Sequence, residues 1–560
     1  MRNLILTLSA LLMLAFTGMA QQVINVKGQV KDKRDGTTLP GVTVMVVGKQ
    51  TGTVTDINGN YSLSVESNAM LRFSFVGMKT QEIPVNNRTR IDVEMEPAIS
   101  QLEEVVVVGY GSTKKLDLTG SVTTVKSDKL GYQPAANIGS VLQGKVAGVQ
   151  VTNSGAPGAA PTIRIRGLGT VNSSADPLFV VDGVVTNDIS FLSPTDIETT
   201  TVLKDASASA IYGVKAANGV IIITTKRNTG NKPAMTYNAY AGFQTAVNQL
   251  PLANNAQYIE LINEKNQLQK EAAGQTYTPL DPANFPDYTN WYDEVMRRQA
   301  FVTNHDIGFS GGTGKNLYFF GAGYFKQEGL LLNQTYERLN LRSSIDMEVN
   351  KHVKVGYSAT LSGFRTNDAP SVFYEAYVAP PVFKPKMDDD STFTNPVDLG
   401  LGNFSNPAAS LYYFNSKSNG LRLVGSVFAE IGFAKYFTFR TQYGTDLGYA
   451  RNRNYTPYYY VSPTQKDTNR TMSRTWTYDY KGVWDNTLTF ENNFGPHRIK
   501  AMAGMAAQYE RNLGTLGSRL GVPYLGENTL YLNLGRSKTS QVSSCGCGHN
   551  PGRYHIACGK

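Results

Sequence analysis

Cysteine is almost absent from this sequence of 560 residues, and the three that occur, Cys545, Cys547 and Cys558, lie near its C-terminal end. Disulfide bonds therefore play no part in the main fold. Charged residues are also scarce, at 17%, and no basic block accompanies the formal net charge of +9. Without such a block the charge does not indicate nucleic-acid binding. We expect it to be scattered over loops and inner surfaces, with a bias toward anionic ligands or lipid headgroups.

Long hydrophobic runs are missing after the first 20 residues. Residues 1–20 combine Arg2 with an apolar stretch from Leu4 to Phe16 and small residues before Gln21, which predicts a secretory signal peptide. The apolar stretch is shorter than the roughly 20 residues that a membrane-spanning helix needs. A secreted chain with no spanning helix is expected to be periplasmic, extracellular or a β-barrel.

Glycine (53) and tyrosine (31) are abundant, which favours β-structure with many turns. Residues 21–98 predict a small β-sandwich, because four short segments alternate apolar and polar residues: 42–46, 61–65, 71–75 and 91–95. Asp56 to Asn60 is interpreted as a turn rather than a calcium loop, since the Gly and Glu that such a loop requires are missing. The segment resembles the carboxypeptidase regulatory-like domain, and it has no His to form a peptidase site.

Residues 99–115 predict a linker with an unusual centre: Glu103, Glu104, Val105, Val106, Val107, Val108, Gly109 and Tyr110. One interpretation is a further buried strand. The other is a docking strand that adds itself to the sheet edge of another protein, with backbone hydrogen bonds supplying affinity. Periodicity alone does not separate the two.

Residues 116–228 predict a compact α+β segment. Short strands are expected at 163–167 and 178–183, a strand followed by a helix over 196–217, and a buried strand at 219–225.

From 234 to 535 the sequence predicts long antiparallel strands of an incomplete transmembrane β-barrel. Apolar and polar residues alternate over ten or more positions, as from Leu339 to Val349, and tight and long connections follow one another in turn. Nine strands are expected, near 235–246, 301–311, 316–326, 336–349, 353–365, 420–433, 437–449, 482–494 and 498–510. A helix is expected at 254–272, inside the first long connection.

Several patterns suggest chemistry without supporting it. Residues 139–145 have phosphate-loop spacing, but Val146 stands where a Ser or Thr is needed. The five His are scattered, Asp388 to Asp390 is interpreted as a solvated loop patch, and the Cys/His tail at 536–560 is interpreted as an aberrant end rather than a zinc site. We therefore expect no enzyme activity, no catalytic residues, no metal site and no cofactor.

A family resemblance rests on motifs in the compact segment. Residues 142–149, 163–167, 177–183, 202–213 and 216–221 closely match the pattern of the SusC/RagA-type TonB-dependent receptors, although Val214-Lys215 replaces the usual Ser-Arg. The resemblance implies that 116–228 is a plug domain, that 103–110 is the TonB box, and that the protein lies in the outer membrane of the cell.

The resemblance also implies partners and a function. TonB would pull on the TonB box to displace the plug, and a SusD-type surface lipoprotein would help capture an oligosaccharide or peptide for import; no nucleic-acid partner is expected. A siderophore or vitamin receptor and a surface adhesin or structural barrel are the alternatives. Because the family closes about 22 strands around its plug, we also expect this chain to be a truncated, non-functional fragment.

Overall fold

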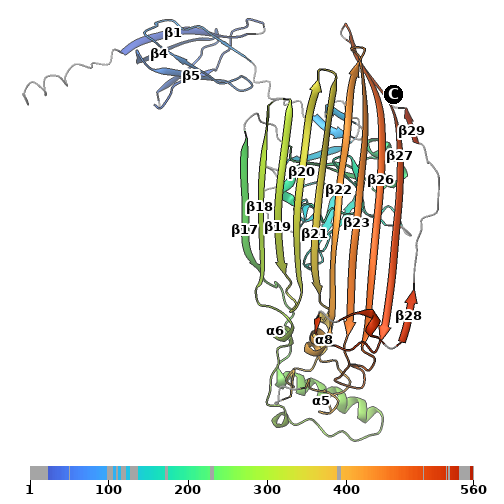
Figure 1. Cartoon of the computed structure of the whole chain (residues 1–560). Helices are drawn as coiled ribbons and strands as arrows, with labels where there is room; N and C mark the ends of the chain where they lie inside the picture. Colours follow the sequence, from blue (N-terminus) through green and yellow to red (C-terminus); the bar gives the residue numbers. More distant parts are fainter. Residues whose placement is uncertain are drawn as a thin grey trace, which may run out of the picture. The chain divides into compact units, whose positions relative to one another are not determined.

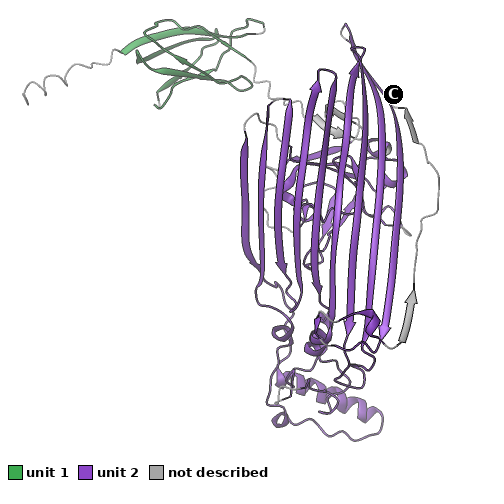
Figure 2. Cartoon of the chain, in the orientation of Figure 1, with its two compact units in different colours: residues 1–105 green, residues 106–560 purple. Residues whose placement is uncertain are grey.

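The computed structural model describes residues 23–96 apart from 34 and 50, 105–108, 111–114, 121–126, 137–170, 174–227, 233–541 apart from 314, 388–391, 496, 525, 528–529 and 536, and 555–558. The chain divides into two compact units, residues 1–105 and 106–560 (Figure 2). The predicted signal peptide at 1–20 lies outside the described residues.

The first unit contains two facing β-sheets. One has the strand order β4-β1-β7 and the other β3-β2-β5-β6. The predicted alternation is confirmed, since Val44, Leu63, Phe73 and Val93 all lie in one buried core. The bounds are β1 Val23–Asp32, β2 Thr43–Val46, β3 Gly52–Val54, β4 Asn60–Glu66, β5 Met70–Ser74, β6 Gln81–Pro84 and β7 Val93–Met95.

Within the second unit, a five-stranded sheet of order β10-β15-β16-β13-β14 forms the α+β segment, hereafter the plug. Its central strands are buried on both faces, because Phe179 and Ile221 pack in one core while Val180 and Ile222 pack in another. A separate hairpin joins β11 to β12. The bounds are β10 Val122–Lys126, α3 Ile138–Val141, β11 Val149–Thr152, β12 Thr162–Ile165, β13 Leu178–Val181, β14 Val184–Thr186, η2 Pro194–Asp196, β15 Ile197–Leu203, α4 Ala206–Ser209, η3 Ala210–Ala216 and β16 Val220–Thr225.

Nine long strands follow and pair with their sequence neighbours as one antiparallel sheet (Figure 1). All nine lie where the sequence predicts strands. Their bounds are β17 Ala234–Gln244, β18 Ala300–Thr313, β19 Asn316–Glu328, β20 Thr335–Asn350, β21 Val353–Asp368, β22 Asn415–Phe433, β23 Phe437–Thr456, β26 Thr471–Phe494 and β27 His497–Leu520. The mainly β fold class with a partial barrel is confirmed.

The two faces of this sheet have opposite chemistry. On β20, Arg338, Asn340 and Arg342 are each 3% exposed, whereas the intervening Leu339 and Leu341 are 52% and 46% exposed. Polar side chains therefore face inward toward the plug and apolar side chains face outward. This reversal of the usual soluble pattern is what a strand surrounded by lipid requires.

The connections between strands differ at the two ends of the sheet. Tight turns join β18 to β19, β20 to β21, β22 to β23 and β26 to β27, whereas helices lie in the long connections at the other end, hereafter the loop end (Figure 1). Those elements are α5 Asn255–Ala272, η4 Pro282–Asn284, α6 Trp291–Val295, α7 Phe373–Val378, α8 Pro407–Tyr413, β24 Tyr459–Tyr460 and β25 Lys466–Asp467. The expected helix α5 begins at a capping box between Asn254 and Gln257. Within the described residues, no helix is both long and apolar enough to cross a membrane.

One expectation needs correction. The single helix expected within 196–217 is a short α-helix followed by a 3-10 segment, because Gly213 takes φ 67° and breaks the helical path. Beyond residue 535, β28 Ser537–Gln541 and β29 His555–Cys558 both pair with β27. Cys545, Cys547 and His549 lie outside the described residues, as do Asp388 to Asp390.

Candidate functional site

Arg342, on the inner face of β20, holds one edge of the plug. Its guanidinium donates hydrogen bonds to the carbonyl oxygens of Asp196 (3.1 Å) and Lys226 (2.6 Å) and to the hydroxyl of Thr225. The guanidinium carbon also lies 4.7 Å from the ring centre of Phe319. A buried guanidinium is stable only when its N–H groups are paired, so this arginine fixes the position of the plug segment that it contacts.

Arg422, on β22, makes a second set of contacts to a different part of the plug. It donates to both carboxylate oxygens of Asp446 on β23, at 2.9 and 2.8 Å. The same guanidinium donates to Asp188 (2.9 Å) and to the Thr186 hydroxyl, both in the plug, and lies over the ring of Phe191. Asp446 therefore orients the arginine, and the arginine binds the plug.

A third contact lies where the plug leads into the sheet. Arg227 donates to both carboxylate oxygens of Asp346, on β20, at 2.9 Å each. Asp346 is 8% exposed, and a single guanidinium nitrogen, Nη1, lies within hydrogen-bond distance of both of its carboxylate oxygens. The C-terminal end of the plug is thus bound to the inner face of the sheet.

Glycines let the plug approach the sheet closely. A Cβ on Gly158 would lie 2.2 Å from the ring of Tyr336, and the φ of +67° at Gly158 already disfavours other residues. The tight turn between β13 and β14 presses against β22 and β23, where Gln442 and Ser426 donate to the carbonyl oxygen of Asp182. The fit between plug and sheet is therefore close as well as polar.

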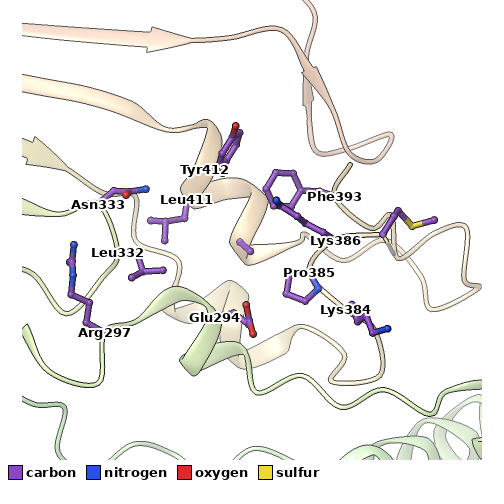
Figure 3. A pocket seen from close by; sticks show the side chains of 12 residues that line it. Glu294, Arg297, Leu332, Asn333, Lys384, Pro385, Lys386, Phe393, Leu411 and Tyr412 are labelled. Carbon is purple, nitrogen blue, oxygen red and sulfur yellow. The ribbon is translucent and has the colours of Figure 1, made fainter. Parts of the chain in front are cut away.

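A cavity of about 680 Å³ lies among the connections at the loop end (Figure 3). Its lining combines apolar and aromatic side chains with charged ones: Glu294, Arg297, Leu332, Asn333, Lys384, Pro385, Lys386, Met387, Phe393, Ala408, Leu411 and Tyr412. Arg297 is held by the carbonyl oxygens of Gly329 and Leu331, each at 2.8 Å. Burial, and then the charge of Asp293, raises the pKa of Glu294.

The walls of this cavity rest on a core of their own. Trp291 of α6 is fully buried, and its ring centre lies 4.9 Å from that of Phe383, with the two rings tilted by 57°. Its indole N–H donates to the carbonyl oxygen of Pro380. Helices α6, α7 and α8 all contribute residues to this core. The loop end is therefore a folded structure that can maintain a binding cavity.

The predicted docking strand is described in part. Val105–Val108 form strand β8, which pairs with β9 Gly111–Lys114 in a sheet of two strands. Glu103, Glu104, Gly109 and Tyr110 lie outside the described residues. The docking role of 103–110 stays a prediction.

The sequence did not single out the arginines that hold the plug. In the sequence, Arg338 and Arg342 are polar residues at alternate positions of a predicted strand, and nothing else distinguishes them. Their partners in the plug lie more than 110 residues away along the chain. The available signal was their charge: arginine at inward positions of a strand needs a buried partner.

Two domain families match the chain. Residues 26–107 match the CarboxypepD_reg-like domain, and residues 114–220 match the TonB-dependent Receptor Plug Domain. Among curated proteins, TonB-dependent receptor P3 of Formosa agariphila is 33% identical over 544 residues, which cover 93% of this chain and 51% of that receptor. TonB-dependent receptor SusC of Bacteroides thetaiotaomicron is 34% identical over 468 residues, covering 77% of this chain and 45% of SusC.

Solved structures share the fold. The RagAB peptide importer in its open-open state aligns with a TM-score of 0.65 and 23% identity, covering 81% of this chain and 53% of that one. A second structure, of the RagAB peptide transporter, aligns with a TM-score of 0.63 and 24% identity, covering 78% and 52%. The chain spans about half the length of the curated relatives it matches.

A plug domain set against a sheet with an apolar outer face defines a TonB-dependent receptor, a class of β-barrel proteins of the outer membrane. Within this class, the chain belongs to the SusC/RagA type, as its identity to receptor P3 and to SusC indicates. The predicted family and outer-membrane location are confirmed. The relatives named above are receptors and transporters rather than enzymes.

Proposed function

We propose that the receptor imports a nutrient, either a glycan or a peptide, across the outer membrane, and that TonB drives import by pulling on residues 103–110. The observation that carries this proposal is how the plug is held. Arg342 and Arg422 of the sheet bind the plug, and Arg227 of the plug binds Asp346 of the sheet. Water can replace these hydrogen bonds and ion pairs as the plug moves. A plug held in this way can be displaced without unfolding the sheet.

The TonB box is proposed to act as an added strand. Val105–Val108 pair with β9 alone among the described strands, so their second edge has backbone groups available to a partner sheet. Strand addition of this kind takes its affinity from main-chain hydrogen bonds. A pull on this segment would pass along the chain through β9 to β10, the first described strand of the plug.

The loop end is proposed to receive the nutrient and a SusD-type lipoprotein. The cavity of about 680 Å³ is within the size range of small-molecule sites. Tyr374, Tyr377 and Tyr412 nearby on α7 and α8 are 75%, 53% and 66% exposed, and exposed tyrosines are common in protein interfaces. The chemistry of the cavity fits a segment of an oligosaccharide or peptide.

The test replaces Val106 with proline in cells that take up the nutrient. Proline removes the backbone N–H and should abolish uptake while leaving nutrient binding at the cell surface intact. Val106→Ala is the matched control, because it removes most of the side chain but keeps the N–H, and it should retain most of the uptake. Normal uptake by Val106→Pro would overturn the proposal.

A further inference from the structure

Basic residues gather on the outer face of the sheet at the loop end. The strand register places Lys417 of β22 opposite Arg453 of β23, and Arg453 opposite Arg474 of β26. Arg451 lies two residues from Arg453 and so shares its face. These four residues, Lys417, Arg451, Arg453 and Arg474, are hereafter the outer cation patch.

The register shows that the patch faces outward. The row of paired residues two positions below Arg451 contains Leu421, Tyr449 and Tyr478, which are 56%, 46% and 41% exposed. Side chains two and four positions away along a strand lie on the same face. The patch therefore lies on the outer face, just beyond Tyr449 and Tyr478, aromatic residues of the kind that marks a membrane–water interface. Arg451 is exposed, whereas the Arg453 side chain is 12% exposed and, like Arg474, is partly covered by the segment after β27.

Acidic residues are missing from the same face. The outward positions are the odd-numbered residues of β22, β23 and β27 and the even-numbered residues of β26. None of these positions is Asp or Glu. The neighbouring strands differ, because Lys326 of β19 lies 4.0 Å from Glu337 of β20 on their outer face. The excess of positive charge is thus confined to one side of the sheet.

One carboxylate reaches the patch from the segment after β27. Glu527 accepts from Arg453 (2.6 Å) and lies 3.0 Å from the Lys417 ammonium. Burial alone would raise the pKa of Glu527, but the hydrogen bonds from Arg453 and Lys417 lower it to about 2. The Arg474 guanidinium donates to the carbonyl oxygen of Leu530, which carries no charge. One carboxylate cannot balance four cations, and like charges on paired strands repel each other.

We propose that the outer cation patch binds the phosphate groups of a phosphorylated glycolipid in the outer leaflet of the membrane. The patch lies at headgroup height on the outer face, where Arg451 is exposed and the Lys417 side chain is half-exposed. It has too few carboxylates, and Arg forms paired hydrogen bonds with phosphate. Bound phosphate would relieve the repulsion between Arg453 and Arg474. A lipid is favoured over a soluble anion because the two tyrosines directly below suit the acyl–headgroup boundary.

The test measures lipid binding to the full chain in nonionic detergent micelles by native mass spectrometry. The probes are diphosphorylated lipid A, the same lipid with its phosphates removed, and inorganic pyrophosphate. In the double variant Arg451→Gln/Arg474→Gln, affinity for the diphosphorylated lipid should fall about 30-fold, since each basic residue near an anionic surface strengthens binding about fivefold. Lys326→Gln is the matched control on the same outer face and should bind as the unmodified chain does.

Each other outcome decides against the proposal. Unchanged binding by the double variant, or an equal loss in Lys326→Gln, would overturn it. Equal affinity for the dephosphorylated lipid would show that the patch does not recognise phosphate. Equal affinity for pyrophosphate would show that the lipid part of the ligand does not contribute. The variant Arg451→Lys/Arg474→Lys keeps the charge but loses the paired hydrogen bonds, so its affinity should lie between those of the unmodified chain and the Gln variant, which distinguishes loss of the site from loss of folding.

Discussion

The contact between Arg342 and the plug can be tested by replacing the arginine with methionine. Methionine keeps an unbranched apolar side chain but removes three hydrogen bonds, leaving the carbonyl oxygens of Asp196 and Lys226 without these donors. Each hydrogen bond to a charged group contributes about 1.5–3 kcal/mol. Burying the guanidinium costs several kcal/mol in return, so the net loss should be about 3 kcal/mol.

That loss should appear in the plug rather than in the sheet. In the full chain reconstituted in lipid, backbone amides of residues 220–226 should exchange their hydrogens about a hundredfold faster, because 1.4 kcal/mol corresponds to a tenfold change. Amides in the middle of β20 should be unaffected. Arg365→Met is the matched control, since Arg365 is exposed on the neighbouring strand β21. Unchanged exchange in Arg342→Met, or the same acceleration in Arg365→Met, would refute the reasoning.

Two further predictions concern the close fit and pH. Gly158→Ala should destabilise the seated plug by about 3 kcal/mol, because the new methyl group would clash with Tyr336 and the φ is positive. Gly144→Ala is the control: it has a similar φ and no neighbour within 4 Å, so it should cost about 1 kcal/mol. Equal melting temperatures of the two variants would contradict this prediction. Glu527 has a lowered pKa, so its contribution to stability is present above about pH 4.5 and is lost as the pH falls through about 2. Glu527→Gln should therefore lower the melting temperature at pH 7 but not near pH 2, and a constant difference would argue against the ion pairs.

The strands were predictable where lipid imposes a simple rule. From Leu339 to Val349 every second residue except Ser343 is apolar, and the observed β20 and β21 follow that pattern. Strand segments that extend beyond the lipid do not need an apolar outer face, so they lack this alternation. For that reason the sequence predicted the start of β26 at 482, whereas the strand begins at Thr471. Its first residues place Arg474 on the outer face, where an apolar pattern would have predicted none.

The candidate site was less predictable because its partners are distant in sequence. Arg422 contacts Asp188 across 234 residues, and no local pattern indicates which inward polar side chain the plug touches. The folded loop end was also missed, because its core joins Trp291 to Phe383 from two different connections. Local periodicity describes each strand or helix but not contacts between segments so far apart.

The polar character of the plug–sheet contacts has a thermodynamic consequence. Val424 is the sheet residue that joins the buried core of the plug within the described part of the chain, so moving the plug exposes little apolar surface to water. Exposure of apolar surface is what makes the heat capacity of unfolding large and positive. Displacement of the plug should therefore have a small heat-capacity change, and its free energy should vary almost linearly with temperature. A hydrophobic interface, by contrast, weakens on cooling because its heat-capacity change is large.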